Sequence, residues 1–187
     1  MTDQQFNEAI SRIRKKDKAA LKEIYEEYIA FIYHTVLNVT GNKETAEDIT
    51  SEFFIRLWEK ADQYKEGQGH RGYLATIARN MAIDHMRKYK KEELMAGMSD
   101  DDEVPDEIEA ASDREGSPED IVVNNLSVEQ ALDKLKPVYR QIITMKVLAD
   151  MTFKEIASVL EMPMGTVTWN YREAIKQLRR FGYDYEF

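Results

Sequence analysis

The sequence predicts an all-α protein with two small helical domains joined by a flexible acidic linker, and three observations predict it. Apolar residues recur at helical spacing on both sides of the middle of the chain. No stretch alternates apolar and polar residues as a strand does. Residues 92–120 hold thirteen acidic residues against one arginine and no aromatic residue, so they bury too little apolar surface to offset their ordering entropy. We therefore expect a domain over 1–91, the linker over 92–120 and a second domain over 121–187.

The first domain is predicted to hold four helices. A short amphipathic helix contains Phe6, Ile10 and Ile13. Turns are expected at Gly41-Asn42 and at residues 67–69. Before, between and after these turns, respectively, the predicted buried stripes are Leu21, Ile24, Tyr25, Tyr28, Ile32 and Val36, then Ala46, Ile49, Phe53, Leu57 and Ala61, then Leu74, Ile77, Ala78 and Met81.

The second domain begins with a helix start signal, Ser117 followed by Pro118 and two acidic residues. Thr152 and Glu155 have the spacing of a capping box, and Pro163 opens a further helix. The buried stripes of these helices are predicted to be Val128, Ala131, Leu132 and Leu135, then Val138, Ile142, Met145 and Leu148, then Phe153, Ile156, Ala157 and Leu160, then Val167, Ala174, Ile175 and Leu178.

Composition excludes several classes of protein. The chain has no cysteine, which excludes disulfides, thiol catalysis and Cys-ligated metal sites. It also lacks phosphate-binding glycine loops, zinc helices and nucleophile elbows, so an enzyme is not expected. The acidic run 100–103 lacks the glycine of a calcium loop, and the three histidines lack ligand spacing, so no metal or other cofactor is predicted.

The net charge of −9 conceals a segregated distribution, because residues 1–91 and 121–187 are each mildly basic and the linker is strongly acidic. The N-terminus has no basic segment followed by an apolar one, and no apolar run is long enough to cross a bilayer. We expect a cytoplasmic protein without membrane insertion.

Residues 152–180 have the arrangement of a helix-turn-helix, with the turn at Glu161-Met162. The second helix of such a unit enters the major groove, and its base-reading residues are expected to face away from Val167 and Ala174. A plain helical hairpin with a basic end is the alternative, and Trp169 could equally be a packing residue. The predicted base-reading residues are Thr166, Thr168, Trp169, Asn170 and Arg172, and the predicted phosphate contacts are Lys176, Arg179 and Arg180.

A second basic cluster lies in the first domain, where cations alternate with aromatic and amide side chains. Cations neutralise phosphates, and aromatic rings stack on unpaired bases, so this composition suits single-stranded nucleic acid. An ordinary solvated helix face is the simpler interpretation of the pattern alone. The cluster consists of Arg79, Arg87, Lys88, Lys90 and Lys91 with Tyr73, Asn80 and Tyr89.

Two separated motif sets resemble the extracytoplasmic-function (group 4) sigma factors of bacterial RNA polymerase. The first set is AEDITSEFFIRLW at 46–58 and GYLATIARNMAIDHMRK at 72–88, and it resembles region two of that family. The second set resembles region four and comprises Leu135-Lys136-Pro137, Arg140, Glu155-Ile156-Ala157, Gly165-Thr166-Val167, Ala174 and Leu178. The pairing of both sets across an acidic linker makes the resemblance specific.

The resemblance implies a protein that recruits core polymerase to promoters and opens the minus-ten DNA. A helix over 44–62 would dock on the clamp coiled coil through Asp48, Glu52, Phe54, Arg56 and Trp58, with core packing as the alternative for Phe54 and Trp58. Minus-ten contacts are implied for Tyr64, Arg71, Arg79, Asn80, Arg87, Lys88, Lys90 and Lys91, with Asn80 helping to hold a flipped base. Region four would read the minus-thirty-five element and meet the polymerase flap. An anti-sigma factor is a further partner that the resemblance leaves open.

This chain departs from the family at Ser51, Tyr73, Trp169-Asn170 and Glu173, which leaves the promoter sequence undefined. Two other functions stay open from the sequence. A stand-alone helix-turn-helix regulator would bind operator DNA without polymerase. A pure interaction protein would use its helices to bind other helices.

Overall fold

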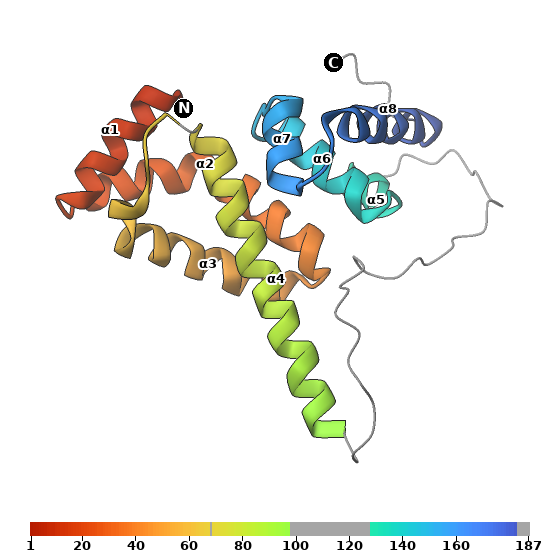
Figure 1. Ribbon diagram of the computed structural model, residues 1–187, viewed down its shortest axis with the longest axis horizontal. Coiled ribbons are helices and arrows are strands. Elements are labelled where there is room, and N and C mark those ends of the chain that lie inside the picture. Colours follow the sequence, from red (N-terminus) through yellow and green to blue (C-terminus); the bar gives the residue numbers. More distant parts are fainter. Residues whose placement is uncertain (68, 98–127, 183–187) are drawn as a thin grey trace. The chain divides into compact units, whose positions relative to one another are not determined.

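The computed structural model describes residues 1–67, 69–97 and 128–182, and all regular structure within these residues is helical (Figure 1). The chain divides into two compact units, whose described parts are residues 1–67 with 69–97, and residues 128–182. The predicted all-α class with two helical units is confirmed. Much of the predicted linker, including the start signal at Ser117, lies outside the described residues, and the domain boundaries stay predictions.

The N-terminal unit contains α1 (Asp3–Arg14), α2 (Lys18–Thr40), α3 (Lys43–Glu59), the short 3-10 helix η1 (Ala61–Gln63) and α4 (His70–Gly97). The central α2 packs against α1, α3 and α4, and α3 also packs against α4. The second half of α4 extends beyond the other three helices, as Figure 1 shows in green.

Local signals define where these helices begin. Thr2, Asp17 and Asn42 each accept a backbone N–H from the first turn of the following helix, which satisfies one of its unpaired donors. Gly41 ends α2 at a φ of 66°, where its N–H bonds to the carbonyl of Leu37. A side chain at this position would be strained, so glycine is required by the turn into α3.

The core of the N-terminal unit is aromatic and aliphatic. Its largest fully buried side chains are Phe6, Phe31, Phe53, Ile10, Ile13, Ile24, Ile32 and Leu74. Each fully buried side chain of this size contributes roughly 1.5–3 kcal/mol relative to exposure. The predicted stripes are largely confirmed, but Tyr25 is 43 % exposed and rests against Phe54 with 4.8 Å between ring centroids.

The C-terminal unit contains α5 (Val128–Asp133), α6 (Pro137–Val147), α7 (Phe153–Leu160) and α8 (Met164–Arg180). Both α6 and α7 pack against α8. Its core includes Leu135, Tyr139 and Ile143 together with Ala174 and Leu178 of α8. Within the predicted stripes, Leu148 is 48 % exposed and therefore not a core residue, and the side chain of Val128 lies outside the described residues.

Two predicted helix ends are wrong. The helix expected over 44–62 ends at Glu59 and gives way to η1. In contrast, α4 continues to Gly97, into residues assigned to the linker. Lysine, glutamate, leucine, methionine and alanine at 90–96 are strong helix formers, and Lys88 lies 3.9 Å from Glu92 one turn later.

Candidate nucleic-acid and polymerase interfaces

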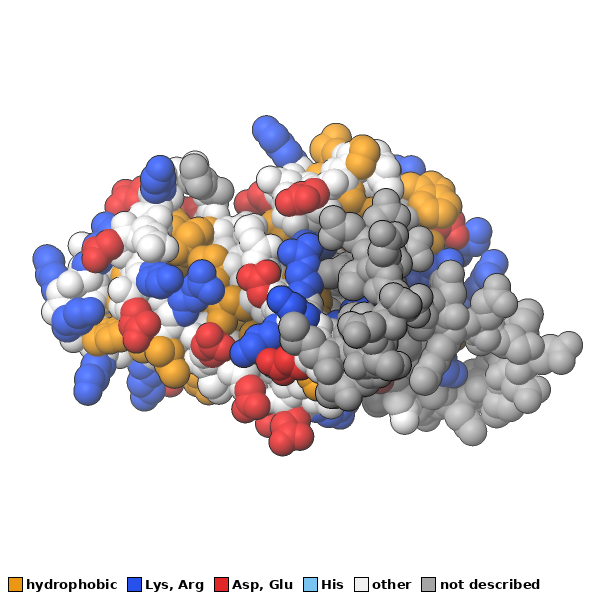
Figure 2. Space-filling model, turned by 60° about the horizontal axis from the view of Figure 1, so that its bottom comes forward, with side chains coloured by type: hydrophobic (Ala, Val, Ile, Leu, Met, Phe, Trp, Pro, Cys, Tyr) orange, Lys and Arg blue, Asp and Glu red, His pale blue; other side chains and the backbone are white. Residues whose placement is uncertain are grey.

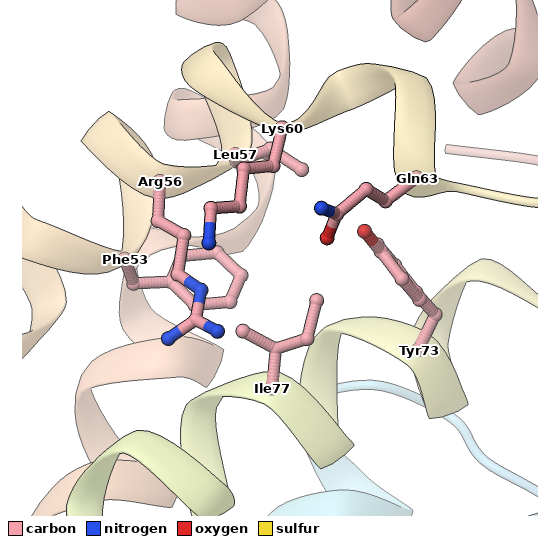
Figure 3. Close-up of a pocket in the computed structure, with 7 residues that line it drawn as sticks. All are labelled: Phe53, Arg56, Leu57, Lys60, Gln63, Tyr73 and Ile77. Atoms are coloured by element: carbon pink, nitrogen blue, oxygen red, sulfur yellow. The ribbon is translucent and has the colours of Figure 1, made fainter.

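A pocket of about 190 Å³ opens between α3 and α4 (Figure 3). It is lined by Phe53, Arg56, Leu57 and Lys60 from α3 and the turn after it, Gln63 from η1, and Tyr73 and Ile77 from α4. Figure 3 shows Gln63 and Tyr73 directing their polar ends toward one another across the mouth. Three kinds of group thus meet here: cations, an amide and an aromatic ring on an apolar floor.

Burial raises the pKa of the Tyr73 hydroxyl, against the opposing effect of Arg56 and Arg14. The hydroxyl therefore stays protonated at neutral pH and can donate a hydrogen bond. Arg56 and Lys60 bring positive charge to the same pocket, while Phe53, Leu57 and Ile77 supply apolar surface. Cations beside an aromatic ring and an amide are a composition found in nucleic-acid-binding sites.

The pocket was missed from the sequence because its residues come from three elements. The sequence predicts a polymerase contact for Arg56 and no site role for Lys60 or Gln63. Asn80, expected to hold a flipped base, is exposed on α4 three residues after Ile77 and does not line the pocket. Arg87, Lys88, Lys90 and Lys91 are exposed along the same helix, and Arg79 and Arg71 are half-buried.

Tyr64 is a correction among the predicted minus-ten residues. Its side chain is 3 % exposed, because it packs edge-on against Phe6 at 5.2 Å and against Tyr73 at 4.9 Å. Its hydroxyl donates to Asn7 Oδ1 at 2.9 Å. Tyr64 is therefore a core residue behind the pocket and has no free face for DNA.

Helix α3 carries the residues predicted to bind polymerase. Asp48 and Glu52 are exposed, as expected. Phe54 is only 5 % exposed, which favours the packing alternative over the predicted polymerase contact. Trp58 is half-buried, with the Lys16 ammonium 5.3 Å from its ring centroid.

Two apolar residues on this surface were not predicted. Ile55 is 58 % exposed beside Glu52, and Tyr25 of α2 covers Phe54 from outside. The helical pattern of apolar residues gives no sign that Ile55 and Tyr25 are exposed. In Figure 2, charged side chains of both signs and hydrophobic ones are interspersed over this unit.

A buried histidine lies where α1, α2 and α4 meet. His70 is 2 % exposed, and its ring stacks on Phe6 with 4.8 Å between centroids. Tyr28 Oη lies 2.5 Å from Nε2, and Nδ1 bonds to the Asp3 carboxylate. A carboxylate can only accept, so these partners assign the proton to Nδ1 and leave Nε2 to accept from Tyr28.

The C-terminal unit contains the predicted helix-turn-helix. Thr152 Oγ1 accepts from the Glu155 N–H at 3.2 Å, and Glu155 Oε2 accepts from the Thr152 N–H at 2.7 Å. Glu161 ends α7 in the left-handed conformation, and α8 begins after Pro163. The predicted capping box and turn are confirmed.

Most of the predicted DNA-reading residues lie on the open side of α8. Thr166, Trp169, Arg172, Lys176 and Arg179 are exposed, and Thr168 is half-buried with its hydroxyl donating to the Met164 carbonyl at 2.9 Å. Trp169 is 58 % exposed, so it is not a packing residue. Hydrophobic side chains of this unit are visible at the surface in Figure 2.

Asn170 is the exception on α8, because its side chain is 6 % exposed. It follows Val167 by three residues and precedes Ala174 by four, which places it on the buried side of the helix. The expectation that it faces away from the core is wrong, and the helical spacing itself could have revealed this. Glu173, in contrast, reaches the open side and lies 3.9 Å from Lys176.

Among residues 1–67, 69–97 and 128–182, no cluster of His, Cys, Asp or Glu side chains could hold a metal ion. Within the same residues, no helix combines the length and apolar character needed to cross a membrane.

In its described residues, the chain thus combines a four-helix unit with a second unit that contains a helix-turn-helix, an arrangement typical of DNA-binding proteins. Residues 24–92 match the family Sigma-70 region 2, and residues 125–178 match Sigma-70, region 4. Neither is a family of catalytic domains.

Curated relatives agree with these matches. The chain is 32 % identical over 178 residues to the ECF RNA polymerase sigma factor SigW of Bacillus subtilis, covering 91 % of this chain and 95 % of SigW. It is 31 % identical over 180 residues to the ECF RNA polymerase sigma factor BldN of Streptomyces coelicolor, covering 92 % of this chain and only 64 % of BldN.

Two solved structures share the fold. One is the sigma factor RpoE in complex with the anti-sigma factor NepR from Bartonella quintana, at a TM-score of 0.60 and 19 % identity over 86 % of this chain and 94 % of that one. The other is CnrH in complex with the cytosolic domain of CnrY, at a TM-score of 0.58 and 15 % identity over 94 % and 95 %.

The chain belongs to the ECF RNA polymerase sigma factors. Its function is that of an RNA polymerase sigma factor, and the stand-alone regulator is not favoured.

Proposed function

We propose that the two units act in succession on one promoter, the C-terminal unit by reading duplex DNA at the minus-thirty-five element and the N-terminal unit by holding an unpaired minus-ten base. The observation that carries this proposal is the pocket of about 190 Å³ between α3 and α4. A pocket that accepts an extruded base stabilises open DNA over paired DNA, which shifts the equilibrium without any hydrolysis.

In the pocket, Tyr73 offers ring surface over the buried Phe53, Gln63 offers an amide for the edge of a base, and Lys60 and Arg56 supply charge for the phosphates. Asn80 and the exposed cations of α4, from Arg87 to Lys91, continue the basic track along the strand. We thereby reassign Arg56 from polymerase to DNA and remove Tyr64 from the DNA-binding set.

On α8, we assign base reading to Thr166, Trp169 and Arg172, and phosphate contact to Lys176 and Arg179. Their exposure along one side of the helix supports this assignment. Arginine recognises guanine through two parallel hydrogen bonds, and exposed Trp169 offers apolar contact to a thymine methyl group.

We assign polymerase docking to the outer face of α3, where exposed Asp48 and Glu52 precede exposed Ile55, and to Tyr25, whose ring packs on Phe54 of the same helix. An apolar centre with a charged rim is the usual composition of a protein interface. The clamp coiled coil is the expected partner there, and the flap is the expected partner of the C-terminal unit.

The protein we propose has no active site of its own, works in the cytoplasm where core polymerase is, and has an anti-sigma factor among its partners. One structural neighbour is a sigma factor in complex with an anti-sigma factor, and the other is CnrH in complex with the cytosolic domain of CnrY, which supports a regulatory partner for this chain.

The pocket is tested by Lys60→Ala in holoenzyme assembled from this chain and sigma-free core polymerase. Loss of one cation at the base-binding site should weaken binding to a single-stranded minus-ten oligonucleotide about tenfold, because stacking and charge act together there. Binding to a duplex that carries only the minus-thirty-five element should not change. Fluorescence anisotropy with each labelled DNA measures both.

The matched control is Lys22→Ala, which removes an equally charged but exposed side chain paired with Glu26 on α2. Equal single-strand affinity of Lys60→Ala and Lys22→Ala holoenzymes would refute the pocket as the base-binding site.

A further inference from the structure

Helix α1 contacts both ends of the connection between α3 and α4. At the first end, Arg14 Nη2 donates to the carbonyl oxygen of Tyr64 at 2.9 Å and Nε donates to that of Ala61 at 3.3 Å. The same guanidinium lies 3.5 Å from the Asp62 carboxylate. One arginine side chain therefore binds both ends of the short turn that carries Gln63.

Asn7, one helical turn after Asp3, contributes the second contact to this end. Its Oδ1 accepts from the hydroxyl of buried Tyr64 at 2.9 Å, and Tyr64 in turn packs against Tyr73 of the pocket. At the other end, Asp3 accepts from the backbone N–H of His70 at 3.1 Å and from its ring, where α4 begins. Phe6 fills the space between the Tyr64 and His70 rings.

These contacts bear directly on the pocket. Gln63 is bracketed by the two carbonyls that Arg14 holds, and Tyr73 follows His70 by one turn of α4. Side chains of a binding site must be held within a fraction of an ångström, and this requires supporting groups outside the site. No residue of α1 lines the pocket itself.

We propose that α1 is a positioning element for the base-binding pocket, in which Arg14 and Asn7 fix Gln63 and Tyr73 and thereby set the discrimination between minus-ten bases. This inference rests on the proposed function of the pocket. Arg14 and Asn7 touch no DNA in this account, so their substitution changes base selectivity and leaves polymerase affinity and duplex binding intact.

Arg14→Ala and Asn7→Ala are each assembled with core polymerase and tested on single-stranded minus-ten oligonucleotides that differ at one base. Affinity for the preferred oligonucleotide should fall about tenfold in Arg14→Ala and about threefold in Asn7→Ala, since a hydrogen bond from a charged donor contributes more than one from a neutral hydroxyl. Affinity for the other oligonucleotides should fall less, so that the selectivity ratio approaches one.

Arg12→Ala is the matched control. It lies in the same last turn of α1, but its guanidinium pairs with Asp17 and Glu23 and not with the connection. Its selectivity ratio should equal that of the unchanged chain. Thermal unfolding of each free variant is measured in parallel. If Arg14→Ala does not fold, the selectivity of Asn7→Ala alone tests the inference.

Unchanged selectivity in a folded Asn7→Ala or Arg14→Ala holoenzyme overturns the inference. If selectivity is unchanged in those variants but Lys60→Ala impairs oligonucleotide binding, only the inference about α1 is refuted and the pocket assignment stands. If Lys60→Ala also has no effect, the pocket assignment itself is refuted.

Discussion

The buried imidazole of His70 is held neutral by its surroundings. Burial is the largest effect on its pKa and lowers it, against the opposing hydrogen bond and charge of Asp3, and Arg71 and the N-terminal ammonium lower it further. Burial also raises the pKa of Tyr28 to about 12, so its hydroxyl stays protonated and donates to Nε2. The pKa of Asp3 is lowered, mainly by its hydrogen bonds from His70.

These shifts give the N-terminal unit a specific dependence of stability on pH. The unfolded chain takes up a proton on His70 as pH falls through the ordinary value of 6.5, whereas the folded unit does so only at lower pH. The free energy of unfolding should therefore fall as pH is lowered from about 7.5 to about 5.5. The lowered pKa of Asp3 affects stability in a separate, more acidic pH range. The free energy of unfolding that it contributes is lost only as pH falls below the ordinary Asp pKa of 3.8.

Urea unfolding of the full chain in a Trp169→Phe background reports on the N-terminal unit through Trp58, the other of the two tryptophans. His70→Gln should remove most of the fall in the free energy of unfolding between about pH 7.5 and about pH 5.5. The control His85→Gln changes an exposed histidine on α4 and should keep it. A His70→Gln profile that parallels the control would contradict the assignment of neutral His70.

Helix α8 carries both positive charge, which attracts DNA phosphates, and negative charge, which repels them, on the side that we assign to DNA. Glu173 pairs with Lys176 at 3.9 Å, which occupies one of the cations expected to meet phosphates. Both side chains are solvent-accessible, so the pair itself contributes little to stability.

Glu173→Gln should raise the affinity for a minus-thirty-five duplex about threefold at low salt, because it removes a negative charge and releases Lys176. The gain should shrink as salt is raised. Asp133→Asn makes the same change of charge on α5, next to Arg140, and should have no such effect. The DNA affinity of both variants is measured against salt concentration. If Glu173→Gln and Asp133→Asn gave the same curve, Glu173 would not face DNA.

The sequence was informative about elements and less so about sites, for reasons that particular residues illustrate. The capping box at Thr152 is a local signal, so it could be predicted together with the turn that follows. Asn170 was placed among the residues that face away from Val167 and Ala174, although its spacing of three and four residues from them puts it on the buried side.

The pocket and its support could not be predicted because they depend on contacts between distant parts of the chain. Gln63 and Tyr73 meet only through the packing of α3 against α4. His70 reaches Asp3 across 67 residues, and Tyr64 reaches Asn7 across 57. Helical periodicity shows which side of a helix is buried and does not show which helix covers it.

For the whole molecule, the distribution of charge matters more than its sum. The strongly acidic segment between the units follows a helix that presents Arg87, Lys88, Lys90 and Lys91. Acidic residues tethered to basic surfaces compete with DNA phosphates for the same cations. We expect the free chain to bind DNA weakly for this reason.

Replacing the acidic residues between 98 and 120 by their amides keeps the length and should raise the DNA affinity of the free chain about tenfold at low salt. The matched control keeps the composition of this segment and shuffles its order, which should leave the affinity unchanged. If the neutralised and unchanged chains gave the same salt-dependent binding curve, competition by the acidic segment would be excluded.

The central claim is that this chain gives promoter specificity to core polymerase. Sigma-free core polymerase is combined with the purified chain, and transcripts are sequenced from a library of random promoter fragments. The account predicts transcripts from fragments that share two spaced elements, with Arg172→Ala altering the upstream one and Lys60→Ala the downstream one. Transcription that is no different with and without the chain would contradict it.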